Sequence, residues 1–277
     1  MNTKDYVPQR DGILVSIMGD QGSGKSSMAR SLVEATMAAG KAAYGFLAPP
    51  ESLSYAGLDF EYTPLEDPEW HPSVDTFKAA GYRNGMKALL GLFKRDDLGA
   101  VVVDTASVLS QCVFRDAMAA YGTDDPTSLG GNARTPYQVH NMRFLEFVDT
   151  LDALRFAKHL HVITLWHQEF REVDGLGAPR KEQEKTGTGM KTVVKWDEAA
   201  LPAMLGSLRQ TISARFDIHF QSQAVLGSRP FRCKLVALPD ATHLTKTRLP
   251  IMPAIQKAGE LANDWPTLLK IIEEAGK

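Results

Sequence analysis

The sequence has few cysteines and no long apolar run. Its two cysteines, Cys112 and Cys233, lie far apart and form neither a metal-ligand spacing nor a disulfide framework. Two unpaired thiols are typical of a protein in a reducing cytosol. No apolar run approaches the roughly 20 residues that span a bilayer, and residues 1–11 lack the apolar stretch of a signal peptide. We therefore expect a cytoplasmic protein that is not associated with a membrane.

The chain also lacks an excess of one charge and any internal repeat. Its formal net charge is -2, whereas a protein that coats nucleic acid with one broad basic face is usually more positive. Any contact with nucleic acid must therefore be confined to a few loops or shared across an oligomer. The 277 residues are 44% hydrophobic and 23% charged, which is ordinary for a globular protein and excludes wholesale disorder.

The strongest signal is a phosphate-binding motif near the start of the chain. Residues 19–26 read GDQGSGKS and match G-x-x-x-x-G-K-[ST] at every fixed position. An apolar run at 13–18 predicts a buried strand before the motif, and residues 25–39 predict a helix after it. Chance gives such a match in roughly one chain of this length in a hundred. The predicted nucleotide-binding residues are Gly19, Asp20, Gln21, Gly22, Ser23, Gly24, Lys25, Ser26 and Ser27.

The chemistry of such a loop assigns a role to individual residues. Glycines let backbone N–H groups turn toward phosphate oxygens, and the helix N-terminus adds its positive end. We expect Lys25 to reach the β- and γ-phosphates and Ser26 to bind Mg²⁺. A second carboxylate usually supports this metal from the end of a neighbouring buried strand. The run AVVV at 100–103 ends in Asp104, which is the predicted second metal ligand; the alternative is an aspartate that caps a turn.

The catalytic base is harder to assign. Thr105 follows Asp104 at a position where many ring ATPases have a glutamate that polarises the attacking water. This departure argues against the AAA+ class and means that the base comes from elsewhere. Glu51 is the first candidate because it follows a strand predicted at 42–47, at the sheet edge that faces the nucleotide. Glu61 is a second candidate of the same kind, and both have the alternative of a solvated glutamate.

Polar residues later in the chain are further candidates. His167 follows a strand predicted at 161–165 and can sense the γ-phosphate, unless it is merely satisfied at the strand end. Basic side chains in the polar segment 168–196 can track a nucleic-acid backbone, although acids nearly cancel them. Lys246 and Arg248 point to the same side of an extended chain and suit the charge on a transferred phosphoryl group. They can reach a neighbouring subunit's nucleotide; the alternative is a solvated edge.

Buried strands that alternate with helices predict an α/β fold with a largely parallel central sheet flanked by helices. Two late apolar segments predict an antiparallel extension. No linker divides the chain, so we expect one domain over residues 1–277 with a core at about 12–253. Strands are predicted at 13–18, 42–47, 100–103, 161–165, 211–220 and 231–238, helices at 25–39, 74–94, 137–158 and 262–275, and loops at 121–136 and 168–196.

The set of motifs resembles the RecA-like P-loop ATPases, and most closely the phage-encoded single-strand annealing ATPases of that group. The resemblance covers about residues 13–253, and five features carry it in order: GDQGSGKSS, VVVDTAS, the strand ending in LWH, the segment LPAMLGSLRQTISARFDIHF, and KTR. It implies ATP and Mg²⁺ as cofactors, single-stranded DNA as a partner through loops 121–136 and 168–196, and a homo-oligomeric ring or filament. It also implies a γ-phosphate sensor at His167, cations acting across a subunit interface at Lys246 and Arg248, and, for a phage protein, the bacterial host cytoplasm.

Several functions stay open. The first is a DNA-dependent ATPase that acts on single-stranded DNA in phage recombination, annealing or replication, and a motor in DNA unwinding or packaging belongs to the same class. The second is a P-loop kinase of nucleotides or other small molecules, for which Arg180 would be the lid arginine. The third is a non-enzymatic switch that binds ATP to organise partners. Fold analogy alone does not separate these functions.

Overall fold

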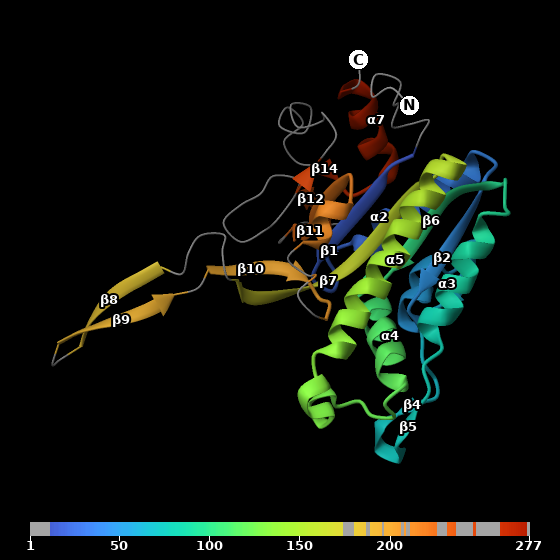
Figure 1. The fold of residues 1–277 in the computed structure, drawn as a ribbon. Helices are drawn as coiled ribbons and strands as arrows, with labels where there is room; N and C mark the ends of the chain where they lie inside the picture. The colour runs from blue at the N-terminus through green and yellow to red at the C-terminus, as the bar shows by residue number, and fades with distance from the viewer. Residues whose placement is uncertain are drawn as a thin grey trace.

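The structure is a computed structural model that describes residues 12–173, 180–186, 189–195, 197–205, 208, 211–225, 232–236, 246–247 and 261–275. Its centre is a sheet with the strand order β14-β12-β11-β1-β7-β6-β2-β3 (Figure 1). The strands of this order are β1 (Leu14–Gly19), β2 (Ala42–Leu47), β3 (Glu61–Pro64), β6 (Leu98–Asp104), β7 (His161–Val173), β11 (Ile218–Val225), β12 (Arg232–Val236) and β14 (Leu261–Ala262).

The strands from β11 to β3 all run parallel. β1 and β6 are buried along their whole length, as expected for parallel strands that have helices on both faces. Their apolar runs are continuous for the same reason. The helices are α2 (Lys25–Ala38), α3 (Gly81–Leu92), α4 (Ala106–Ala119), α5 (Thr135–Lys158) and α7 (Trp265–Ala275).

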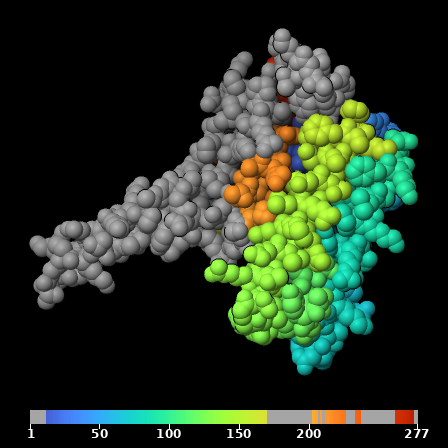
Figure 2. Space-filling model, in the orientation of Figure 1, coloured from blue at the N-terminus to red at the C-terminus, as the bar shows by residue number. Residues whose placement is uncertain are grey.

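Alternate residues of β1 enter two separate cores. Leu14 and Met18 pack with the layer formed by α3, α4 and α5, to which Phe144 belongs. Ile17 instead packs with α2 and α7, where Trp265 is buried. Figure 2 shows that α3 and α5 form a continuous surface on the side of the molecule where this helical layer lies. Among the described residues, no helix is long and apolar enough to cross a membrane.

The antiparallel extension begins at β11, which is the edge strand of the parallel region opposite β3. β12 and β13 (Lys246–Thr247) both pair antiparallel with β11, and β14 pairs antiparallel with β12. β7 lies between β1 and β6, so the strand before the phosphate-binding motif and the strand that ends in Asp104 are not neighbours. The mostly parallel sheet, the helical layers on its two faces and the late antiparallel strands confirm the predicted α/β fold class.

Several element boundaries differ from the prediction. The helix predicted at 74–94 begins only at Gly81, because the buried Asp67 accepts hydrogen bonds from the N–H groups of Ala80 and Gly81 at 2.8 and 2.7 Å. Before it, β4 (Trp70–His71) and β5 (Thr76–Phe77) form a short hairpin. α4 was not predicted. The loop at 121–136 contains a 3-10 helix (Pro126–Asn132), residues 211–220 begin as a 3-10 helix (Ile212–Arg215), and the last helix starts at Trp265.

The prediction of a loop at 168–196 is wrong in its secondary structure. β7 continues past the sheet to Val173 and pairs antiparallel with β10 (Asp197–Pro202). β8 (Arg180–Thr186) and β9 (Gly189–Lys195) form a hairpin, and Figure 1 shows it beyond the β7–β10 pair. Paired antiparallel strands can satisfy their backbone hydrogen bonds without an apolar pattern in the sequence. The charged, glycine-containing sequence of 168–196 therefore did not indicate strands. Residues 174–179, 187–188 and 196 lie outside the described residues.

Candidate nucleotide-binding site

The register of the parallel strands brings polar residues to one edge of the sheet. Gly19 at the end of β1 pairs with His167 on β7, and Asp104 at the end of β6 pairs with Leu165 on β7. On the other side of β6, Asp104 pairs with Leu47, the last residue of β2. This edge is formed by the carboxyl ends of the strands, where open α/β sheets bind ligands.

The phosphate-binding loop connects β1 to α2. Gly22 and Gly24 have positive φ values of 74° and 89°, which L-residues with a side chain rarely adopt. Lys25 is buried, and its Nζ donates to the carbonyl oxygens of Gly19 and Asp20 at 2.8 and 2.6 Å. Burial lowers the pKa of Lys25, while the nearby carboxylates of Asp104 and Glu51 raise it. The first turn of α2 has no acidic residue, so its positive end is uncompensated and suits an anion.

Residues from β11, β12 and the chain after β14 pack behind this loop. The Ser222 hydroxyl donates to the carbonyl oxygen of Ser23 at 2.5 Å, and the Asn263 amide donates to the carbonyl oxygen of Gly24 at 2.6 Å. A Cβ atom on Gly24 would lie 2.5 Å from the Sγ of Cys233. No sequence motif indicates Ser222, Cys233 or Asn263, because their contacts with the loop join segments that lie far apart in the chain.

Asp104 is fully buried beside the loop. Its Oδ2 accepts a hydrogen bond from the Tyr55 hydroxyl at 3.0 Å, and its Oδ1 is buried without a partner among the described residues. Burial and, to a smaller extent, the charge of Glu51 raise the pKa of Asp104 to about 7, although Ser26, Tyr55 and Lys25 act in the opposite direction. Asp104 Oδ1 is thus a buried carboxylate oxygen without a partner among the described residues, and Ser26 lines the same pocket. Oxygen atoms of this kind fit a hard cation such as Mg²⁺.

No group of three or more His, Cys, Asp or Glu side chains in the described part of the chain forms a metal cage. That finding agrees with the chemistry of Mg²⁺, which usually takes one or two carboxylates and completes its shell with phosphate oxygens and water. Ser26 and Asp104 are therefore the protein ligands that fit this metal.

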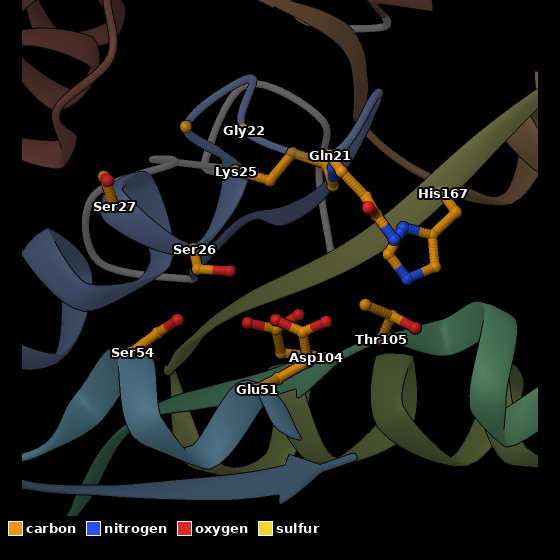
Figure 3. A pocket seen from close by; sticks show the side chains of 11 residues that line it. Gln21, Gly22, Lys25, Ser26, Ser27, Glu51, Ser54, Asp104, Thr105 and His167 are labelled. Carbon is orange, nitrogen blue, oxygen red and sulfur yellow. The ribbon is translucent and has the colours of Figure 1, made fainter. Parts of the chain in front are cut away.

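Glu51 and His167 flank the same space. Glu51 belongs to a 3-10 helix (Pro49–Tyr55) that follows β2 directly. Burial lowers the pKa of His167, the charge of Lys25 lowers it further, and Glu51 raises it. The backbone N–H of His167 donates to the Ser107 hydroxyl of α4 at 3.1 Å. These contacts leave the His167 ring at the pocket wall while its backbone is held by α4 (Figure 3).

These residues surround one pocket of about 460 Å³. Figure 3 shows the Asp104 and Glu51 side chains together, opposite Ser26 and Lys25. A space that joins backbone N–H donors and a lysine to two carboxylates can hold a polyphosphate together with a divalent cation. The lining residues are Gln21, Gly22, Gly24, Lys25, Ser26, Ser27, Glu51, Ser54, Asp104, Thr105 and His167.

Other candidate residues lie away from this pocket. Glu61 stands at the start of β3, where its carboxylate pairs with Arg95 at 2.7 Å, so it does not face the nucleotide edge. Lys246 is paired through its backbone with His219 on β11, on the side of β11 that faces away from β1. Arg248 lies outside the described residues. The structure therefore brings together Lys25, Ser26, Glu51, Asp104 and His167, but not Lys246.

Comparison with known proteins gives one family. The model that matches residues 11–196, more than half of the chain, is described as an AAA domain. This match does not support the argument from Thr105 against the AAA+ class, since a chain with threonine after the aspartate matches a family of that description. No curated protein matches the chain. Among solved structures, the flagellar accessory protein FlaH from Methanocaldococcus jannaschii is similar at 12% identity over 85% of this chain and 84% of that chain, with a TM-score of 0.40.

Proposed function

Because this chain belongs to the AAA-domain family of P-loop ATPases, we propose that it binds ATP with Mg²⁺ and hydrolyses the triphosphate. One observation carries this proposal. Lys25, Ser26, Asp104, Glu51 and His167 come from four separate stretches of sequence and meet around one pocket. A chance P-loop would not have a buried carboxylate, a second acid and a histidine around its lysine.

Each residue has a distinct task in this reaction. Bound Mg²⁺ would supply positive charge that neutralises the charge developing on the phosphates. Lys25 stabilises the charge on the β- and γ-phosphates, and the N–H groups at the start of α2 bind phosphate oxygens. Ser26 and Asp104 hold the metal. Glu51 accepts a proton from the attacking water, since Thr105 cannot do so.

We further propose that turnover is coupled to single-stranded DNA. β7 connects His167 in the pocket wall directly to the β7–β10 ribbon, and the N–H of Ala203 after β10 donates to the carbonyl oxygen of His167 at 2.7 Å. α4 begins next to Asp104 and also contacts this region, because the Leu205 N–H donates to the Ser110 hydroxyl at 3.2 Å. The sequence from 168 to 196 has basic residues that suit a phosphate backbone: Arg171, Arg180, Lys181, Lys185, Lys191 and Lys195.

The chain would work as a homo-oligomeric ring or filament. Lys246 lies on the far side of β11 from the P-loop strand β1, a position that suits action on a nucleotide bound to a neighbouring subunit. Arg248, two residues later in the sequence, is proposed to act with it. With DNA, ATP and self-assembly combined, the role that suits this chain is recombination, annealing or replication of phage DNA in the host cytoplasm.

The test is release of inorganic phosphate from ATP, measured with and without single-stranded DNA at low salt. We expect Mg²⁺-dependent release that single-stranded DNA stimulates, and no release by Lys25→Ala. If DNA neither stimulates release nor binds to the intact protein, the DNA part of the proposal is wrong. Sedimentation or light scattering with a non-hydrolysable ATP analogue tests assembly, and a monomer under all conditions contradicts the trans action of Lys246 and Arg248.

The same assay separates the other reaction classes. A nucleotide kinase would transfer phosphate to an added nucleoside or nucleotide, whereas an ATPase yields free phosphate only. A non-enzymatic switch would bind ATP and assemble with very slow turnover. Either result would contradict hydrolysis as the main activity while leaving ATP binding at Lys25 intact.

A further inference from the structure

Tyr55 is buried against Asp104, the proposed metal ligand, although no sequence motif includes Tyr55. Its hydroxyl donates to Asp104 Oδ2 at 3.0 Å, and the two residues are 4% and 0% exposed. Its ring packs against Phe60 with centroids 5.1 Å apart, which fixes the direction of the hydroxyl.

This hydrogen bond distinguishes the two oxygens of Asp104. Oδ2 is occupied by Tyr55, while Oδ1 has no partner among the described residues. The last torsion of an aspartate is soft, so a carboxylate held at neither oxygen would rotate readily. With Oδ2 held, the free Oδ1 keeps one direction toward the pocket that Ser26 also lines.

The 3-10 helix that carries Tyr55 is also attached to Asp104 at its other end. The Ala48 N–H donates to the backbone carbonyl oxygen of Asp104 at 2.7 Å, and Glu51 lies between Ala48 and Tyr55. Two contacts with one residue therefore set the position of Glu51 relative to Asp104.

The helix after the P-loop holds the same segment from the opposite side. The Arg30 guanidinium of α2 donates to the carbonyl oxygens of Ser54 and Ala56 at 3.0 and 3.1 Å. The segment thus connects the P-loop helix to the strand end at Asp104. Its movement would displace Glu51 and release Asp104 Oδ2 together.

From these contacts we propose that Tyr55 is a positioning residue, which directs Asp104 Oδ1 to the metal of the bound triphosphate and sets Glu51 beside it. The inference rests on the proposed function, because it concerns the same site. It predicts that the Tyr55 hydroxyl contributes to binding of the metal–nucleotide complex, and not to binding of metal-free ATP. Tyr55 itself touches neither the triphosphate nor the water.

The test compares Tyr55→Phe with Tyr44→Phe in the full chain. Phenylalanine keeps the ring and removes one hydroxyl in both variants, but the Tyr44 hydroxyl bonds Thr63 at 2.8 Å on β3 and does not contact Asp104. Binding of a fluorescent ATP analogue is measured in EDTA and across a Mg²⁺ titration, and phosphate release is measured in parallel. For Tyr55→Phe we expect the half-saturating Mg²⁺ concentration to rise about tenfold, as for loss of one hydrogen bond to a charged group. Affinity in EDTA should be unchanged, and Tyr44→Phe should match the wild type in both.

A second variant guards against misfolding. Arg30→Met removes the bonds to Ser54 and Ala56 at a partly exposed position, and we expect the Mg²⁺ requirement to rise in the same direction by a smaller factor. If Tyr55→Phe and Arg30→Met both match Tyr44→Phe while the wild type binds and hydrolyses MgATP, the positioning role is wrong and the proposed function stands. If the wild type binds no MgATP, the proposed function itself fails.

Discussion

Burial of Asp104 should make this carboxylate a cost to the stability of the ligand-free protein. Its pKa lies at about 7 in the folded state because burial and Glu51 disfavour the charge. In the unfolded chain the group loses its proton near its ordinary value of 3.8. The unfolded state therefore binds fewer protons between about pH 4 and pH 7, and stability falls as pH rises through this range. Above pH 7 the full penalty is present.

The size of the effect follows from the two pKa values. A rise from 3.8 to about 7 corresponds to about 4 kcal/mol at roughly 1.36 kcal/mol per pKa unit. Asp104→Asn removes the charge and keeps the acceptor for Tyr55, but its amide lacks a partner at the Oδ1 position, which costs about 1 kcal/mol. We therefore expect Asp104→Asn to unfold with a free energy about 2 to 3 kcal/mol higher than the wild type at pH 8.

Urea unfolding in EDTA, without nucleotide, measures this difference. The denaturation midpoint of Asp104→Asn should lie about 1 M above the wild-type midpoint at pH 8, and the gap should nearly close at pH 5. The control is Asp125→Asn, because the Thr127 hydroxyl and other hydrogen bonds lower the pKa of the exposed Asp125, so its replacement gives no gain. A variant that is no more stable than the wild type at pH 8, or a gain that is the same at both pH values, would refute the reasoning.

Three further substitutions test other parts of the site and core. Glu51→Gln should lower kcat for ATP hydrolysis at least about a hundredfold while MgATP binding persists, as expected for loss of a general base. Phosphate release measures the first effect and nucleotide binding the second. An unchanged kcat would mean that the base is another residue. Gly24→Ala should abolish ATP binding, because its Cβ would lie 2.5 Å from Cys233 Sγ and because its φ of +89° is rarely adopted by residues with a side chain. Isothermal titration calorimetry measures the affinity for ATP, and a normal affinity would contradict the packing described. Arg155→Met should lower the free energy of unfolding by about 3 kcal/mol, because it removes the buried guanidinium that pairs with Asp217 at 2.9 Å and with Asp152 at 2.6 Å. Chemical denaturation checks this, and a neutral variant would contradict it.

The fold was predictable where local sequence decides the structure. The strands at 13–18 and 161–165 were predicted from apolar runs that contain β-branched residues, and both lie in the parallel sheet. The start of α3 was not predictable, because Asp67 fixes it through hydrogen bonds from a separate segment. The β8–β9 hairpin was missed because the sequence of residues 180–195 has no apolar period that indicates a strand.

The candidate site divides in the same way. Lys25, Ser26 and Asp104 follow from motifs that include their own flanking strand and helix. Glu51 was placed at the pocket by position alone, since it follows a strand whose carboxyl end faces the nucleotide edge. The role of Tyr55 could not be predicted from the sequence, because it lies in a segment with prolines and acids and belongs to no motif. Only the structure shows that its hydroxyl donates to Asp104.

Phosphate release from MgATP by the wild type and by Lys25→Ala, measured beside binding of a fluorescent ATP analogue, tests the central claim most directly. The pocket predicts that the wild type binds the analogue and releases phosphate only with Mg²⁺, and that Lys25→Ala releases none. Equal release by the two proteins, or failure of the wild type to bind ATP, would contradict the assignment of this pocket as the site of ATP hydrolysis.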